Sequence, residues 1–184
     1  MTPGGALKEL LNRLKEGLPQ LQEPPIKILT SYFYQIRFFK PYYIPLSTAV
    51  YDPKWYHQNR GPLYQFEDKN GVINGIRIPP FIPDRRCEGL CSGRENCVTK
   101  DPRSCKFLKQ YYNQLNELDF NEMMRRFQNL SENIKWLKSL DKEPIFVLIF
   151  HETPTNPCSE RWMVWKWFMN NGYQIKEFDK TKIN

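Results

Sequence analysis

Short apolar runs along the chain predict strands, and the clearest of them lies near the C-terminal end. Residues 145–150 are six consecutive apolar residues, rich in β-branched and aromatic side chains, and they follow Pro144. A run of this kind is typical of a strand that is buried on both faces of a sheet. Shorter runs at residues 26–33, 44–47 and 173–178 predict further strands.

Between these runs, apolar residues recur at steps of three and four and predict helices. Residues 104–118 and 121–140 each carry one apolar stripe, and Asp119 is the expected N-cap of the second helix. Residues 161–169 are apolar nearly all round, which indicates a helix buried on several sides. The pattern therefore predicts one α/β domain over residues 26–184, a small, mostly parallel sheet covered by helices.

Residues 1–25 are predicted to be a separate appendage. Residues 6–18 are predicted to form an amphipathic helix whose leucines share one stripe: Leu7, Leu10, Leu11, Leu14 and Leu18. Pro19 and the Pro24-Pro25 pair end this helix. It either packs on the domain or binds a protein partner or a second copy of the chain. Packing is favoured, because an exposed leucine stripe promotes association.

Four of the five cysteines form a cluster with the spacing Cys-x3-Cys-x5-Cys-x7-Cys: Cys87, Cys91, Cys97 and Cys105. In a chain without a secretory signal, such a cluster is more typical of a metal site than of disulfides. Four thiolates suit a tetrahedral zinc ion, and nearby glycines let a short loop fold around it. We therefore expect a structural zinc site that orders a cysteine-rich insertion at about residues 82–104. An iron–sulfur cluster, ranked below zinc, and four reduced cysteines are the alternatives.

The polar turn after the central strand is the best candidate for chemistry. His151 and Glu152 end the strand, and Cys158 and Ser159 lead into the helix that begins near Arg161. In an open parallel sheet, ligands bind beyond the carboxyl ends of the strands, where a helix N-terminus attracts anions. We expect Arg161 to hold an anion, Cys158 to be a nucleophile, Glu152 a general base and Ser159 the N-cap. Alternatively, Cys158 is a buried small residue and Arg161 forms an internal ion pair with Glu152.

Other candidate ligand-binding residues come from the N-terminal half of the domain. The first strand ends in Thr30, Ser31 and Tyr32, which would reach the same sheet edge as the turn. A long loop rich in Pro and Gly follows the second strand, and we expect its residues Lys54 and Trp55 to lie near a ligand.

Charge and aromatic content suit a ligand that contains phosphate. The chain has a net charge of +7, a pI near 9.1 and 15% aromatic residues, although a merely soluble basic surface explains these values equally well. Cations and aromatic rings interleave in residues 34–60, so this stretch could stack bases and pair phosphates. The alternative, favoured for four of the rings, is that they fill the core: Phe38, Phe39, Tyr42 and Tyr43. With no run of ~20 apolar residues and no signal sequence, a cytoplasmic protein without membrane contact is expected, in the host cytoplasm if a phage encodes it.

The stretch PIFVLIFHETPTNPCSER and the upstream segments ILTSYF and YYIPLSTAVYDPKWY resemble the bacterial and phage family catalogued as domain of unknown function four-eight-eight. The resemblance covers residues 26–178. Members of that family typically end the strand with Cys-Tyr-Glu and open the helix with Cys-His-Arg. This chain has Phe150-His151-Glu152 and Cys158-Ser159-Glu160-Arg161, so it lacks the motif His and its Arg stands one residue later. The resemblance implies an α/β fold and these candidate residues, but no substrate.

Three classes of function follow. The leading one is an enzyme that acts on a nucleotide, a nucleic acid or another phosphate-bearing substrate at the turn between Glu152 and Arg161. The second is a non-catalytic module that binds nucleic acid through the aromatic and basic surface of residues 34–60. The third is a phage-type protein that binds a host protein through the zinc-bound loop and the N-terminal helix.

Overall fold

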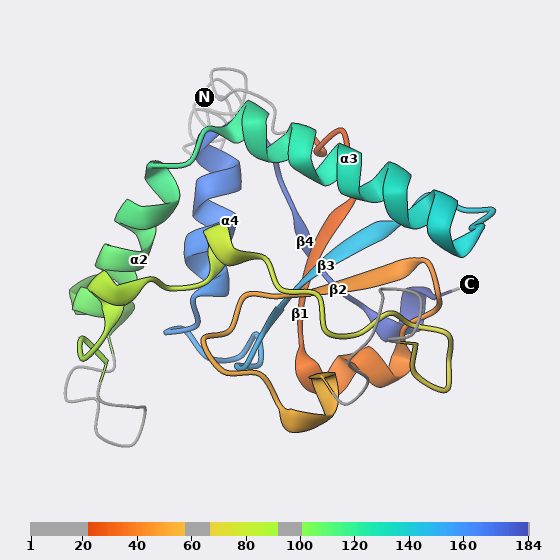
Figure 1. Ribbon diagram of the computed structural model, residues 1–184. Coiled ribbons are helices and arrows are strands. Elements are labelled where there is room, and N and C mark those ends of the chain that lie inside the picture. The colour runs from red at the N-terminus through yellow and green to blue at the C-terminus, as the bar shows by residue number, and fades with distance from the viewer. Residues whose placement is uncertain (1–21, 58–66, 92–100, 184) are drawn as a thin grey trace, which may run out of the picture.

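The structure is a computed structural model that describes residues 22–57, 67–91 and 101–183. Its strands form a parallel sheet in the order β2-β3-β1-β4 (Figure 1). The bounds are Ile28–Tyr32 for β1, Tyr43–Ser47 for β2, Ile145–Phe150 for β3 and Lys176–Glu177 for β4. The predicted small parallel sheet is therefore confirmed. β3 lies between β1 and β2 and is buried along its whole length, which explains its continuous apolar sequence.

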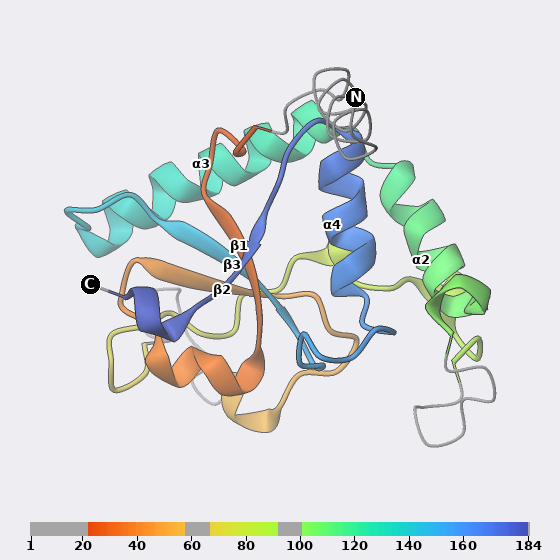
Figure 2. The ribbon, with the colours of Figure 1, turned by 180° about the vertical axis from the view of Figure 1, so that it is seen from behind.

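Three α-helices lie on one side of this sheet (Figures 1 and 2). They are α2 (Lys106–Asn116), α3 (Phe120–Lys138) and α4 (Arg161–Asn170). α3 and α4 lie over the sheet, and α2 packs beside α4 on the side away from the strands; apolar side chains of all three helices belong to one core with Phe146 and Leu148. None of the helices in the described residues is long and apolar enough to cross a membrane.

Short 3-10 helices and loops cover the other face. The first two are η1 (Phe33–Phe38) and η2 (Lys54–His57), and the C-terminal one is η8 (Lys180–Lys182). Phe39 and Tyr43 are buried in a second core on this face, as the core-filling alternative predicts, and Phe38 and Tyr42 are partly buried against it. The other 3-10 turns are η4 (Pro79–Phe81), η5 (Arg85–Cys87) and η7 (Pro102–Ser104).

The connections diverge at the carboxyl ends of β1 and β3. The chain leaves β1 for η1 on one face of the sheet and leaves β3 for α4 on the other face. In α/β proteins, ligands usually bind at the edge of the sheet where the connections of neighbouring strands diverge in this way. The predicted turn at residues 151–161 lies at this edge.

Several predicted elements differ from the structure or lie outside it. β4 has only two residues, against six predicted, because it pairs with β1 only at Leu29 and Thr30 before the chain turns into η8. Between residues 67 and 78 a tight turn at Gly71 (φ 75°) closes a single antiparallel bridge, from Glu67 to Ile73. The N-terminal helix predicted over residues 6–18 lies outside the described residues.

Candidate functional site

Arg161, the first residue of α4, is fully buried at the carboxyl edge of the sheet. Its Nη1 donates to the Glu152 carbonyl oxygen at 2.6 Å, and its Nη2 donates to the Ser31 carbonyl oxygen at 2.9 Å. The carboxylate beside it is that of Glu177, with Nη2 to Oε1 and Nε to Oε2 both at 3.2 Å. The ion pair that the sequence suggested between Arg161 and Glu152 therefore has Glu177 as its acidic partner.

Glu177 and Thr30 complete this buried network. Thr30 donates from Oγ1 to Glu177 Oε2 at 2.6 Å and accepts from Trp165 Nε1 at 2.9 Å. Burial raises the pKa of Glu177 and lowers the pKa of Arg161, while their mutual attraction acts in the opposite direction. Glu177 was not among the predicted site residues; its only signal in the sequence is that it is the one carboxylate of the strand predicted over residues 173–178.

The turn before α4 brings Cys158, Ser159 and Glu152 close to Arg161. The N–H of Cys158 donates to Asn156 Oδ1 at 2.9 Å, and the N–H of Arg161 donates to Ser159 Oγ at 3.3 Å. Ser159 Oγ, which is buried, lies 3.5 Å from Glu152 Oε2. The assigned N-cap is Glu160, yet Ser159 supplies the hydroxyl that accepts from the helix N-terminus. Because the Arg161 side chain has no exposed surface, an anion from solvent does not reach it in this conformation.

The other predicted ligand-binding residues do not gather at one place. Thr30 and Ser31 are buried in the sheet, and the hydroxyl of Tyr32 accepts from Gln35 at 2.7 Å. Lys54 and Trp55 lie in η2 on the surface, where 42% of Trp55 is exposed. The predicted residues thus divide into a buried network and a surface group.

A buried carboxylate fixes the loop that carries Trp55. The Asp52 side chain is only 2% exposed and contacts the Ser47 hydroxyl, His57 Nε2 and, at 3.3 Å, Arg77 Nε. Arg77 also donates to the carbonyl oxygens at the start of this loop. Asp52 and Arg77 were not predicted from the sequence, because their contact joins two loops that are distant along the chain.

Trp55 lines a pocket of about 850 Å³, which we name the aromatic pocket. Tyr34 and Arg37 from η1 form another wall, and Lys69 and Asn70 come from the tight turn. The Tyr34 side chain is 54% exposed, and the guanidinium carbon of Arg37 lies 3.6 Å from the centre of its ring. Two accessible aromatic rings and a stacked arginine thus surround one cavity.

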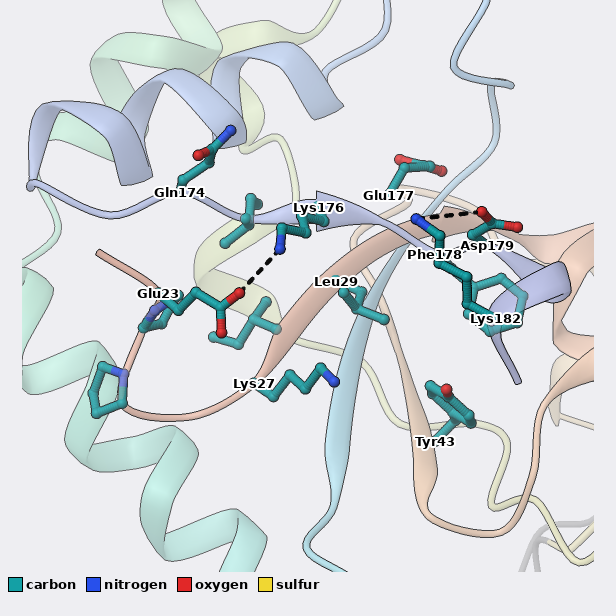
Figure 3. A pocket seen from close by; sticks show the side chains of 14 residues that line it. Glu23, Lys27, Leu29, Tyr43, Gln174, Lys176, Glu177, Phe178, Asp179 and Lys182 are labelled. Atoms are coloured by element: carbon teal, nitrogen blue, oxygen red, sulfur yellow. Dashed lines mark hydrogen bonds and ion pairs between the residues drawn. The ribbon is translucent and has the colours of Figure 1, made fainter. Parts of the chain in front are cut away.

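A second pocket, of about 570 Å³, lies beside β4 and has a different character (Figure 3). Lys176 lies 3.0 Å from Glu23, and Lys182 lies 3.7 Å from Asp179, so both of these cations already have carboxylate partners. Its charges are therefore largely neutralised by the protein itself.

The described cysteines of the predicted zinc site occupy three different environments. Cys87 is buried, and burial raises the pKa of its thiol to about 11. Cys91 is exposed, and Cys105 caps α2 by accepting from the Leu108 N–H at 3.5 Å. Among the described residues, no group of three or more His, Cys, Asp or Glu side chains is placed to hold a metal. Cys97 lies outside these residues, so the zinc site stays a prediction.

No family model, curated protein or solved structure matches the chain. The resemblance to domain of unknown function four-eight-eight therefore stays a prediction, and so does catalysis at the turn before α4.

Proposed function

We propose that the protein binds single-stranded nucleic acid through the aromatic pocket. The observation that carries this proposal is the exposure of Tyr34 and Trp55, 54% and 42%, on the walls of one cavity that Arg37 also lines. Each base stacked on an aromatic side chain contributes about 1–3 kcal/mol to the free energy of binding, and all four bases can stack in this way. The net charge of +7 supports the same class of ligand, since a basic surface attracts the phosphate backbone.

The shape of the site favours unpaired bases over a duplex. A cavity of about 850 Å³ falls in the size range of small-ligand pockets, and it admits a base that stands out from a strand. The bases of a duplex are stacked on one another, so their faces are not free to meet Tyr34 or Trp55.

Contacts within the protein fix the position of the Trp55 side chain in the absence of a ligand. Phe33 and Tyr56 meet the Trp55 ring edge-on, with ring centres 6.1 and 6.0 Å away. The Tyr56 hydroxyl donates to the Ile76 carbonyl oxygen at 2.6 Å, and the Asp52 contacts fix the preceding loop. A rigid aromatic surface loses little conformational freedom on binding, which favours affinity.

Fluorescence anisotropy with labelled single-stranded DNA and RNA at low salt tests this proposal. Trp55→Ala and Tyr34→Ala should each weaken binding by about 5- to 150-fold, the equivalent of one lost stacking contact. Trp136→Ala is the matched control, because Trp136 is 80% exposed on α3, which covers the other face of the sheet.

Absence of binding by the unchanged protein would refute the proposal. An equal loss in the Trp136 and Trp55 variants would also refute it, because the effect would then not belong to the aromatic pocket.

A further inference from the structure

We propose that a neighbouring cavity, the cation pocket, binds a phosphate of the strand whose bases stack in the aromatic pocket. This inference rests on the proposed function and extends it from the bases to the backbone. The cation pocket has a volume of about 480 Å³ and is lined by Arg37, Lys40, Lys180 and Asn70, among others. Lys180 belongs to η8, which lies beside η1 in both ribbon views (Figures 1 and 2).

The cations of this pocket have no carboxylate partner in the part of the chain that the structure describes. Within the described ranges, no Asp or Glu lines this pocket, and none of Arg37, Lys40 and Lys180 forms a salt bridge. The pocket beside β4 is the opposite case, since its Lys176 and Lys182 are paired with carboxylates (Figure 3). Three cations that repel one another around a cavity are stabilised by an anion from outside.

The contacts of Arg37 and Lys180 orient their charges. Arg37 donates from Nε to the Tyr34 carbonyl oxygen at 3.1 Å, and Asn70 Nδ2 donates to the Arg37 carbonyl oxygen at 3.3 Å. The two terminal nitrogens of Arg37 remain for a phosphate, whose oxygens match the planar guanidinium. The Lys180 ammonium lies 4.7 Å from the centre of the Phe38 ring.

The two pockets are neighbours, because Arg37 and Asn70 line both of them. A base against Tyr34 therefore lies next to a place for the phosphate attached to the same strand. This arrangement selects a ligand that combines an aromatic base with a phosphate over a nucleoside or an uncharged aromatic compound. It also makes the C-terminal turn, through Lys180, a part of the binding surface.

The test compares a single-stranded oligonucleotide with one of the same sequence whose methylphosphonate backbone is uncharged. Lys40→Ala and Lys180→Ala should each reduce the steepness of log affinity against log salt by about 0.7 for the charged oligonucleotide. Both variants should bind the uncharged one as the unchanged protein does. Lys109→Ala, which removes an exposed charge from α2, should leave the salt dependence as it was.

Unchanged salt dependence in both lysine variants would overturn the proposal, and so would an equal loss of affinity for the uncharged oligonucleotide. Failure of the stacking proposal has a different result: Trp55→Ala then binds normally while the lysine variants still lose salt dependence. Inorganic phosphate, titrated as a competitor, distinguishes a phosphate of the nucleic-acid backbone from a free phosphate ion as the anion that the cation pocket binds. The oligonucleotide should displace it; if it does not, the pocket binds a free anion and the backbone assignment is overturned.

Discussion

Arg161 joins the carboxyl ends of three neighbouring strands through one side chain. Its guanidinium contacts the end of β1 through the Ser31 carbonyl, the end of β3 through the Glu152 carbonyl, and β4 through the Glu177 carboxylate. A buried charge needs such partners, because a charge removed from water without them is strongly destabilised. At the scale of residues, the arginine that looks like an anion site along the sequence therefore has an architectural role in this conformation.

Removal of one partner should show that role. The amide of Glu177→Gln supplies one acceptor oxygen where the carboxylate supplies two, which leaves a donor of Arg161 or Thr30 unpaired, so we expect the free energy of unfolding to fall by about 1–3 kcal/mol. Urea denaturation measures this loss. Glu132→Gln, an exposed change on α3, is the matched control and should have little effect. A Glu177→Gln variant that unfolds like the unchanged protein would contradict the architectural role and return Arg161 to the candidates for catalysis.

The same pair of proteins also reveals the pH dependence that Glu177 causes. Burial raises the pKa of Glu177 above its ordinary value of 4.5, so the folded protein retains the proton at pH values where the unfolded chain has lost it. The contribution of Glu177 to stability therefore falls as the pH rises from 4.5 to the raised pKa, and is constant above it. The difference in stability between the unchanged protein and Glu177→Gln should change in this window only.

At the scale of elements, the sequence predicts the strands and helices whose position depends on the pattern of apolar residues within the segment itself. The continuous apolar run of β3 and the apolar stripes of α2 and α3 gave those elements nearly correct bounds, because burial and periodicity leave a direct signal. The partners of Arg161 and of Asp52 could not be predicted in this way. Each contact joins segments brought together only by the sheet order, which apolar patterns do not encode. The surface position of Trp55 depends on the same long-range packing.

The loop before η2 should therefore lose its rigidity when Asp52 is changed. Asp52→Asn removes the charge between His57 and Arg77, and its amide offers one acceptor oxygen in place of two to these side chains and the buried Ser47 hydroxyl, so one donor is left unpaired at a cost of about 1–3 kcal/mol. We expect faster hydrogen exchange in residues 48–57 and weaker nucleic-acid binding, because Trp55 follows this loop. Asp141→Asn, an exposed change after α3, serves as the control. Unaltered exchange and affinity in Asp52→Asn would separate the loop from the aromatic pocket.

At the scale of the whole molecule, the two faces of the sheet are closed to different degrees. The helices α3 and α4, with α2 beside α4, cover one face, whereas short 3-10 helices and loops cover the other (Figures 1 and 2). Short elements cover a sheet less completely than long helices, and the aromatic and cation pockets both lie around η1 on this second face. The division explains why the proposed ligand site is displaced from the strand-to-helix turn, where sequence analysis placed it.

The predicted zinc site belongs to the helical side of the sheet, where the metal would link η5 to the start of α2. Cys87 lies at the end of η5 and packs in the same core as α2, and Cys105 caps the start of that helix. Burial raises the pKa of the Cys87 thiol to about 11, so zinc must displace a proton, and its affinity should increase as the pH rises.

Purified protein should contain about one zinc ion per chain, and a chelator should lower its melting temperature, since the binding energy of a structural metal is folding energy. Cys91→Ser should lose the metal, whereas Cys158→Ser, outside the cluster, should retain it. Metal-free protein with an unchanged melting temperature would establish the four cysteines as reduced thiols, and a brown, iron-containing preparation would replace zinc with an iron–sulfur cluster.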